Sequence, residues 1–225
     1  MPPFGDTVVL LLFGPPGCGK GTQSRLIADW LKIPAISTGN MLRAEIKAGT
    51  GLGKAAQATI AAGGLVSDDL VNQVLQARIQ QPDCSRGFIL DGYPRTLEQA
   101  GFLDRSLAEI HAGRPVVLHF DVPTDALIGR MTSRRLCPKC GRTYNLLSLR
   151  PKTPGKCDDD GEPLITRKDD REEIFRERLK AYDELTRPIL AHYHDYLHIQ
   201  GDLSPAYIFE EITGLLEPSG KDRLR

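Results

Sequence analysis

The residues with the clearest chemical potential lie near the start of the chain, in the sequence GPPGCGKGT from Gly14 to Thr22. Its glycines permit backbone conformations in which consecutive N–H groups turn toward one anion. Lys20 and Thr22 stand where an ammonium and a hydroxyl group could reach the same phosphates. In the simplest pattern of this kind Ser or Thr follows the lysine directly, whereas here Gly21 intervenes. The stretch predicts a phosphate-binding loop that uses Gly17, Cys18, Gly19, Lys20, Gly21 and Thr22.

A second group of candidate residues lies in FILDGYPRT, Phe88 to Thr96. Asp91 ends an apolar run, so we expect its carboxylate at the carboxyl edge of a parallel sheet, where ligands bind in open α/β folds. There it could hold Mg²⁺ through water, because magnesium keeps much of its hydration shell. An aspartate that merely caps a turn is the alternative. Gly92 and Pro94 predict a turn that aims Arg95 back over the strand ends.

A third group has the spacing of metal ligands. Cys137 and Cys140 are followed by a glycine, and the same pattern of ligand, two residues, ligand and glycine recurs at Cys157 and Asp160. Three thiolates and a carboxylate can complete a tetrahedral zinc site without an open position, so the site would be structural. The alternatives are unpaired surface cysteines and a nucleic-acid-binding zinc ribbon, which the low aromatic content beyond Tyr144 disfavours. The ligand types also admit iron or cobalt.

Composition narrows the possible partners. The 225 residues contain 29 Lys and Arg against 29 Asp and Glu, so no net charge attracts nucleic acid or an anionic membrane. No apolar run approaches the roughly 20 residues of a membrane span, and the first strand is expected too early to leave room for a signal peptide. The composition therefore predicts a cytoplasmic protein without nucleic-acid or membrane partners. The odd number of cysteines makes a disulfide framework improbable, so Cys18 and Cys84 are expected to be free thiols.

The elements that must position these groups alternate between strand and helix. We expect strands at Val8–Phe13, Ile33–Ser37, Phe88–Asp91, Val116–Val122 and Tyr196–Ile199. Between them the pattern predicts helices at Gly21–Leu31, Met41–Ala62 with a pause at its glycines, Ser67–Gln80, Ala100–Ile110, Asp125–Thr132, Lys168–Leu197 with a bend at Pro188, and Pro205–Leu216. This alternation predicts an α/β fold with a parallel sheet. An insertion of about 35 residues follows Thr132, too long for an ordinary loop.

The motifs together carry a family resemblance. GPPGCGKGTQ, ISTGNMLR, GGLVSDD, FILDGYPRT, the arginines from Arg130 to Arg135, the cysteine knuckles and TRKDD resemble the nucleoside monophosphate kinases, and among them the long-lid bacterial-type adenylate kinases with a zinc-binding lid. The resemblance implies a monomer that catalyses reversible, Mg-dependent transfer of the ATP γ-phosphoryl group to AMP, giving two ADP. It implies a P-loop three-layer fold with a five-stranded parallel sheet. The implied core is 1–36, 67–132 and 171–225, with a helical AMP-binding segment at 37–66 and a zinc-bearing lid at 133–170.

The resemblance also implies roles for individual residues. Catalysis would use Lys20, Arg95, Arg134, Arg167 and Arg178. ATP would be bound by the phosphate loop together with Arg130, Arg134, Tyr144 and Leu203. AMP would be bound by Thr38, Arg43, Leu65, Val66, Gly92, Arg95, Gln99, Arg167 and Arg178. Asp169 and Asp170 have two interpretations, as a lid hinge near the phosphates or as the acids of a helix N-terminus.

One position departs from the family pattern. Asn40 stands where the family usually has Asp. Because Asn keeps the size and hydrogen-bonding capacity of Asp, we expect activity to survive, and Asn40→Asp to change catalysis by less than about a hundredfold.

Two other functions are alternatives to an adenylate kinase. The first is a related enzyme, a UMP/CMP-type or GTP-using monophosphate kinase, against which Gln99 and the long lid favour AMP and ATP. A P-loop regulator with a zinc module is the alternative outside the enzymes.

Overall fold

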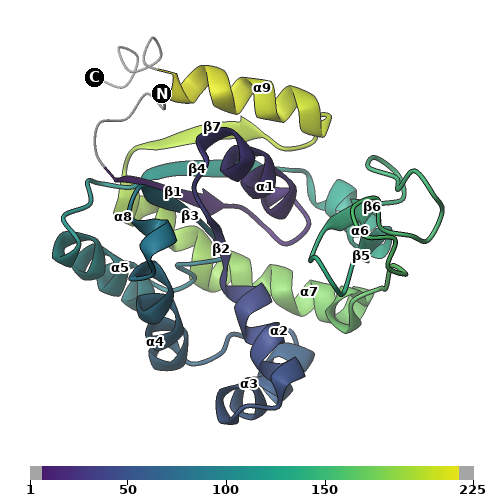
Figure 1. Cartoon of the computed structure of the whole chain (residues 1–225), viewed down its shortest axis with the longest axis horizontal. Helices are drawn as coiled ribbons and strands as arrows, with labels where there is room; N and C mark the ends of the chain where they lie inside the picture. The colour runs from purple at the N-terminus through teal and green to yellow at the C-terminus, as the bar shows by residue number, and fades with distance from the viewer. Residues whose placement is uncertain (1–6, 218–225) are drawn as a thin grey trace.

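The computed structural model describes residues 7–217, apart from the side chain of Lys168. Its central sheet is entirely parallel and has the strand order β2-β3-β1-β4-β7 (Figure 1). The strands are β1 (Val8–Phe13), β2 (Ala35–Ser37), β3 (Gly87–Asp91), β4 (Val116–Asp121) and β7 (Tyr196–Gln200). The expected five-stranded parallel sheet is therefore confirmed, and the carboxyl ends of its strands meet at one edge.

Helices cover both faces of the sheet. They are α1 (Lys20–Leu31), α2 (Thr38–Ala48), α3 (Gly51–Ala61), α4 (Asp68–Ile79), α5 (Leu97–Glu109), α6 (Thr124–Thr132), α7 (Glu172–Ala181), α8 (Leu190–Tyr193) and α9 (Pro205–Leu216). Helices α1 and α9 lie on one side of the sheet, and α4 and α5 lie on the other (Figure 1). The result is the three-layer arrangement that the family resemblance implies, built on the parallel sheet that the alternating pattern predicts.

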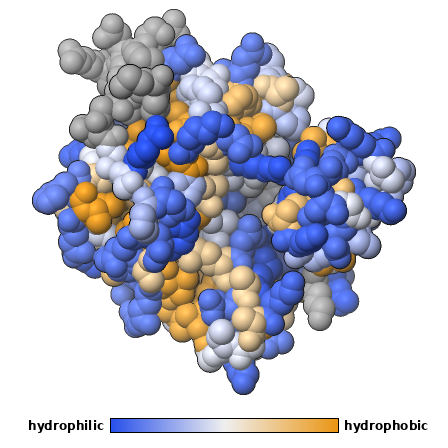
Figure 2. Space-filling model, in the orientation of Figure 1, coloured by the Kyte–Doolittle hydropathy of each residue, from blue (hydrophilic) through white to orange (hydrophobic). Residues whose placement is uncertain are grey.

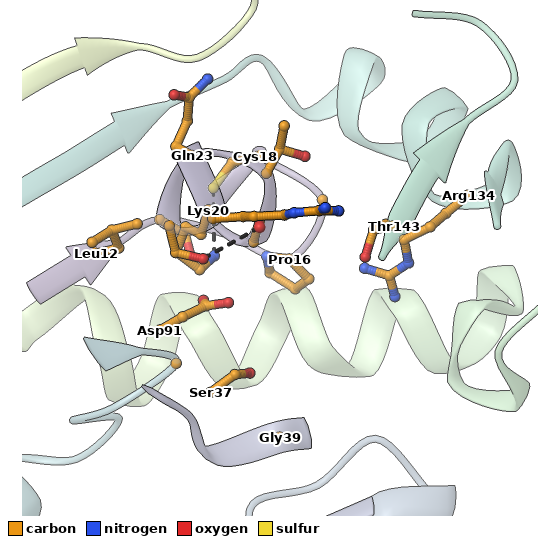
Figure 3. A pocket seen from close by; sticks show the side chains of 18 of the residues that line it. Leu12, Pro16, Cys18, Lys20, Gln23, Ser37, Gly39, Asp91, Arg134 and Thr143 are labelled. Carbon is orange, nitrogen blue, oxygen red and sulfur yellow. Dashed lines mark hydrogen bonds between the residues drawn. The ribbon is translucent and has the colours of Figure 1, made fainter. Parts of the chain in front are cut away.

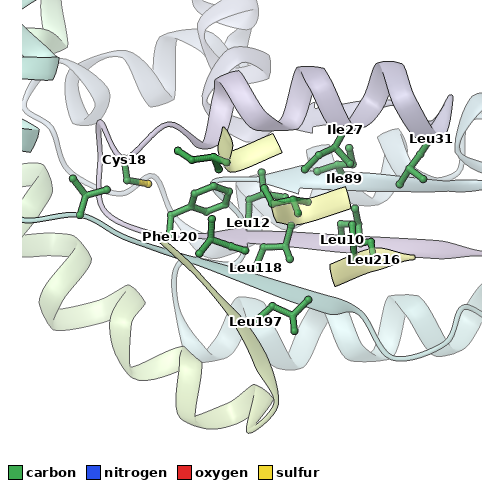
Figure 4. Packing of buried hydrophobic residues seen from close by; sticks show 14 of the residues in the cluster. Leu10, Leu12, Cys18, Ile27, Leu31, Ile89, Leu118, Phe120, Leu197 and Leu216 are labelled. Atoms are coloured by element: carbon green, nitrogen blue, oxygen red, sulfur yellow. The ribbon is translucent and has the colours of Figure 1, made fainter. Parts of the chain in front are cut away.

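The central strand β1 shows why both faces need a cover. Its side chains alternate, so that Leu10 and Leu12 enter one apolar cluster while Val9 and Leu11 enter the other. The first cluster includes residues of α1 and α9 such as Ile27 and Leu216 (Figure 4). The second receives residues of α4, α5 and α8. With both faces buried, β1 ends in a fixed place, and the loop that follows it is anchored there.

Two insertions project from this core at the carboxyl edge. Helices α2 and α3 form a pair below the sheet, and residues 133–170 form a separate body beside it (Figure 1). The second body contains the antiparallel strands β5 (Arg134–Leu136) and β6 (Thr143–Asn145). We call residues 133–170 the lid. In the space-filling view its mostly hydrophilic surface is separated from the core by a hollow (Figure 2).

The single long helix expected from Lys168 to Leu197 is wrong. A 3₁₀ turn at Lys168–Asp170 precedes α7, which gives way to a π turn at Tyr182–Thr186, a 3₁₀ turn at Arg187–Ile189 and the short α8. Pro188 has no N–H group and its ring clashes with the carbonyl group four residues earlier, so the regular hydrogen bonding is disrupted here. Leu197, counted in the helical pattern, lies in β7.

No helix within the described part of the chain, residues 7–217, has the length and apolar character needed to cross a membrane.

A buried histidine in the sheet makes the stability of the fold sensitive to acid. His119 of β4 is 9% exposed, and its Nε2 atom lies 3.2 Å from the hydroxyl group of Tyr182. Burial, with a smaller contribution from the nearby His198, lowers the pKa of His119 to about 4. Since an unfolded histidine has a pKa near 6.5, the unfolded chain binds a proton below that pH that the folded chain does not. The free energy of unfolding should therefore fall from pH 6.5 toward pH 4.

We expect His119→Gln to remove about 1 kcal/mol of this acid sensitivity at pH 5, allowing for solvent screening. Glutamine retains an amide that can bond with Tyr182. Urea unfolding at pH 7.5 and pH 5.0 gives the difference in free energy of unfolding for each protein. His111→Gln, at an exposed turn, is the matched control. An equal loss of stability at pH 5.0 in the wild type and His119→Gln would contradict the assignment.

Candidate functional site

A cleft of about 1150 Å³ lies at the carboxyl edge of the sheet, between the core, the α2–α3 pair and the lid. It exceeds the roughly 300–1000 Å³ of a usual single-ligand pocket. Most of the predicted site residues line it: Gly17, Cys18, Gly19, Lys20, Gly21, Thr22, Arg43, Leu65, Asp91, Gly92, Arg95, Arg130, Arg134, Tyr144, Arg167, Arg178 and Leu203. Figure 3 shows the loop around Lys20 with Asp91 on one side and Arg134 and Thr143 of the lid on another.

The loop after β1 has the geometry of an anion site. Gly19 is the N-cap of α1 with φ 105°, and it has no side chain with which to cap the first N–H groups of the helix. Those N–H groups and the positive end of the helix dipole are therefore available to an anion. The Lys20 ammonium donates to the carbonyl oxygens of Gly14 and Pro15 at 2.6 and 2.9 Å (Figure 3). The ammonium group of Lys20 is thus held against the backbone of its own loop.

The side chain of Cys18, within this loop, points into the apolar core. It is fully buried, and a Cβ atom placed on Gly14 would come within 2.7 Å of its Sγ. Gly14 has φ 149° as well, so both its conformation and its space require glycine. Through these contacts the loop is supported from below by a thiol, which agrees with the prediction of an unpaired cysteine at position 18.

Asp91 lies at the end of β3, next to the start of α1. A Cβ atom placed on Gly21 would be 3.5 Å from the Oδ2 atom of Asp91, so the carboxylate faces the first turn of α1. Lys20 and Thr22 belong to the same turn and line the same cleft. The carboxylate and the hydroxyl group of Thr22 are oxygen donors of the kind that a hydrated magnesium ion uses.

Two buried carboxylates organise the arginines on the far side of the cleft. Asp170 is 3% exposed and forms a bidentate ion pair with Arg134, whose Nε lies 2.7 Å from Oδ2. Asp169 is 8% exposed and accepts from Nη1 of Arg178 at 2.9 Å, while Nη1 of Arg43 lies 4.0 Å away. Both acids lie in the 3₁₀ turn at Lys168–Asp170, ahead of α7, which begins at Glu172, and their side chains bond with arginines that line the cleft.

Positive charge is nevertheless in excess here. Burial, together with the nearby charge of Arg178, lowers the pKa of Arg95 to about 10. Burial also lowers the pKa of Arg167 to about 9, together with the charges of Arg134 and Arg43. The Nε atom of Arg167 is buried without a hydrogen-bond partner in the described part of the chain. Guanidinium groups crowded in this way favour a ligand with several negative charges, such as phosphate groups.

The residues predicted for ATP do not all face the cleft in the same way. Arg130 donates from Nη1 to the carbonyl oxygen of Gly201 at 2.6 Å, which places it beside Leu203 at the cleft wall. Tyr144 borders the cleft but is only 1% exposed. Its hydroxyl oxygen accepts from the N–H of Asp158 at 2.7 Å and lies 3.4 Å from Sγ of Cys157. Tyr144 therefore forms part of the lid interior.

The cleft lining does not include Thr38, Val66 or Gln99, which were predicted to bind AMP. The hydroxyl group of Thr38 donates to the carbonyl oxygen of Gly92 at 2.9 Å, while Val66 packs against the apolar core. Both ends of the Gln99 amide are occupied. Its Nε2 donates to Asp68 at 2.6 Å, and its Oε1 accepts from the N–H of Arg95 at 2.8 Å. In this arrangement Gln99 orients the turn that carries Arg95.

Asp68 is a residue whose contacts sequence reasoning missed. Its two carboxylate oxygens accept from Gln99 and from the hydroxyl group of Thr96, at 2.6 and 2.7 Å. In the sequence it reads only as a first-turn acid of α4. Its partners lie in a different element about thirty residues away in the chain, so no local spacing could have indicated them.

The four predicted metal ligands are brought together in the lid. One ligand atom from each of Cys137, Cys140, Cys157 and Asp160 lies within 4.8 Å of the others. The two knuckles also have the same internal hydrogen bonds. Gly141 N–H donates to Cys137 O at 3.1 Å, and Gly161 N–H donates to Cys157 O at 2.9 Å. The donor set and its closeness fit a tetrahedral zinc ion.

An ion pair connects this metal-ligand cluster with the core. Arg25 of α1 donates from Nη2 to Oδ2 of Asp159 at 2.8 Å. Asp159 also pairs with Arg142, which lines the cleft from the lid. Asp159 stands between two of the metal-ligand positions, Cys157 and Asp160. The contact joins residues that are far apart in the sequence, and no motif predicted it.

Most of the chain is similar to known adenylate kinases. The sequence model of the family described as "Adenylate kinase" matches residues 12–197. The adenylate kinase of Petrotoga mobilis is 42% identical over 215 residues, which cover 94% of this chain and 99% of that protein. The adenylate kinase of Methanothrix thermoacetophila is 43% identical over 210 residues, covering 92% and 97%. That of Anaeromyxobacter sp. (strain K) is 41% identical over 213 residues, covering 95% of each.

Proposed function

Because the chain belongs to the adenylate kinase family, it catalyses the reaction of ATP and AMP to two ADP, and we propose that its cleft does so by positioning both nucleotides and stabilising their charge with arginines. The observation that carries this proposal is the excess of buried guanidinium groups opposite the phosphate loop. A single loop could bind one phosphate chain. A second positive wall facing it suits a second phosphorylated substrate.

The proposed step is an in-line transfer. An oxygen of the AMP phosphate forms a bond with the γ-phosphorus of ATP, and the bond from that phosphorus to the β–γ bridging oxygen breaks, leaving ADP. The attacking oxygen is already anionic, so the site needs no strong general base. Its tasks are to hold the two substrates in line and to offset the repulsion between their charges.

We assign the residues to the two sides of the cleft as follows. The phosphate loop, Gly17 to Thr22, holds the ATP phosphates, and Lys20 moves from its loop carbonyls to the β- and γ-phosphates. Arg130 and Leu203 contact the ATP nucleoside, while Tyr144 supports the lid from inside. Arg43 and Arg95 bind the AMP phosphate, and Arg134, Arg167 and Arg178 face the transferring group. Leu65 and Gly92 border AMP, while Thr38, Val66 and Gln99 support that side.

Two metal ions belong to this proposal. Adenylate kinases use Mg²⁺ with ATP, and Asp91 with Thr22 would hold it here through water, where the ion would neutralise phosphate charge. Zinc would be held by Cys137, Cys140, Cys157 and Asp160, and would stabilise the lid without taking part in the reaction.

The lid at 133–170 and the AMP-binding segment at 37–66 are proposed to close over the substrates, excluding water. Residues 1–6 and 218–225 of the expected core lie outside the described residues.

We further expect a cytoplasmic monomer whose partners are ATP, AMP and ADP rather than nucleic acid or membrane. The equal numbers of basic and acidic residues support this expectation, since they leave no net charge to attract a polyanion.

The test is direct chromatography of the products formed from Mg-ATP with AMP, GMP, UMP or CMP as acceptor. We expect two ADP for each ATP consumed with AMP, and at least about a hundredfold lower kcat/KM with the other acceptors, a discrimination of nearly 3 kcal/mol. Faster transfer to UMP or CMP would contradict the assignment of AMP. No transfer by folded, metal-replete protein would contradict the function altogether.

A further inference from the structure

Asn40 contacts one of the arginines assigned to the acceptor phosphate. It lies in the first turn of α2, three residues before Arg43, so the two side chains share a face of the helix. The Oδ1 atom of Asn40 accepts a hydrogen bond from Nη2 of Arg43 at 2.7 Å. Both side chains line the cleft. The amide therefore fixes the guanidinium group at the place from which it can reach the AMP phosphate.

Arg43 differs from its neighbours in what holds it. Arg134 and Arg178 donate directly to the buried carboxylates of Asp170 and Asp169. Within residues 7–217, the ion pair of Arg43 is a long one, with 4.0 Å between its Nη1 and Oδ2 of Asp169. Its short contact is with a neutral amide oxygen. Its positive charge is therefore less compensated than that of the other two arginines, although its position is still fixed.

A carboxylate at position 40 would act differently. It would have the same shape and would form a stronger, charge-assisted bond with Arg43. An incoming phosphate dianion would then have to compete with that carboxylate for the guanidinium group and would also be repelled by it. Asn avoids both effects.

We propose that Asn40 is a positioning residue that directs Arg43 toward the acceptor phosphate without neutralising it, and thereby increases the affinity of this enzyme for AMP. The inference rests on the proposed assignment of Arg43 to the AMP phosphate. It deepens that assignment by giving the departure from the family's usual Asp a specific effect on one of the two substrates.

The test compares the wild type with Asn40→Asp and Asn40→Leu. Titration calorimetry with AMP alone gives the dissociation constant, and steady-state rates give KM for AMP and for ATP separately. For Asn40→Asp we expect AMP to bind about three to ten times more weakly, with KM for ATP changed less than about twofold. The effect should shrink at about 0.5 M salt, because the added charge is exposed and therefore screened.

Asn40→Leu separates the effect of orienting Arg43 on AMP affinity from the effect of added charge. It removes the acceptor for Arg43 but adds no charge, so its weaker AMP binding should depend less on salt than that of Asn40→Asp. Gln57→Glu, exposed on α3 outside the cleft lining, adds a negative charge to the same segment and is the matched control.

Unchanged or tighter AMP binding in Asn40→Asp, an equal rise in KM for ATP, or an equal effect of Gln57→Glu would overturn the proposal. Failure of the proposed function is a different result, since the wild type would then form no ADP from AMP at all.

Discussion

Lys20→Met should reduce kcat for ADP formation by at least about a thousandfold, or roughly 4 kcal/mol of transition-state stabilisation. Lys20 is the ammonium group of the loop, and its Nζ lies within hydrogen-bonding distance of the carbonyls of Gly14 and Pro15. In the proposed mechanism it would move from there to the β- and γ-phosphates and offset the charge that develops during transfer. Methionine keeps the length of the side chain and removes only the charge and the donors.

Single-turnover and steady-state rates measure the loss, and thermal unfolding shows whether the fold survives. Lys54→Met, at an exposed position of α3 outside the cleft, should keep nearly all activity. A Lys20→Met protein that unfolds normally yet keeps more than about a tenth of the wild-type kcat would contradict the role. The same variant separates an enzyme from a nucleotide-binding regulator, since a regulator would have no turnover to lose.

Removal of a metal ligand should have the second largest effect. Cys157→Ser is expected to lower the zinc content from about one ion per chain to nearly none and to lower the temperature of lid unfolding by about 10 °C or more. The reason is the small size of the lid core, whose buried apolar cluster consists of Cys137, Tyr144 and Cys157 with Leu164 packed against it. Such a cluster is too small to replace the metal.

Elemental analysis and scanning calorimetry of protein purified without added zinc measure both quantities. Two acids in the same knuckle provide a matched pair: Asp160→Asn should lose the metal, whereas Asp159→Asn should keep it. Wild-type protein that contains no zinc and takes up none on addition would contradict the assignment of these residues as zinc ligands. So would a Cys157→Ser protein with full zinc content.

Local patterns were sufficient for the parts of the site that lie on continuous stretches of chain. The apolar run of β1, the glycines of the loop and the start of α1 predicted the strand, the turn and the uncapped helix start that the structure has, because each depends on neighbours in the sequence. The repeated knuckle predicted the ligand cluster for the same reason. Each of these units contains its own turn chemistry, so tertiary contacts had little to add.

Contacts between distant segments could not be predicted in this way. Gln99 was expected at AMP, but Asp68 and the backbone of Arg95 occupy its amide. The apolar spacing from Phe175 onward predicted one long helix bent at Pro188, but it could not show that this stretch would divide into α7, a π turn, a 3₁₀ turn and the short α8. Asp169 and Asp170 likewise became arginine partners only when the lid and α7 were brought together.

The buried arginines have a consequence for how nucleotides arrive. The chain as a whole carries no net charge, so a nucleotide in bulk solution experiences little attraction from a distance. The positive wall of the cleft acts within about a Debye length, some 8 Å at physiological ionic strength. Nucleotide binding should therefore begin with a diffusional encounter at the mouth of the cleft, followed by short-range electrostatic attraction into it. Cellular polyanions such as nucleic acids, too large to enter, would compete poorly for the same arginines.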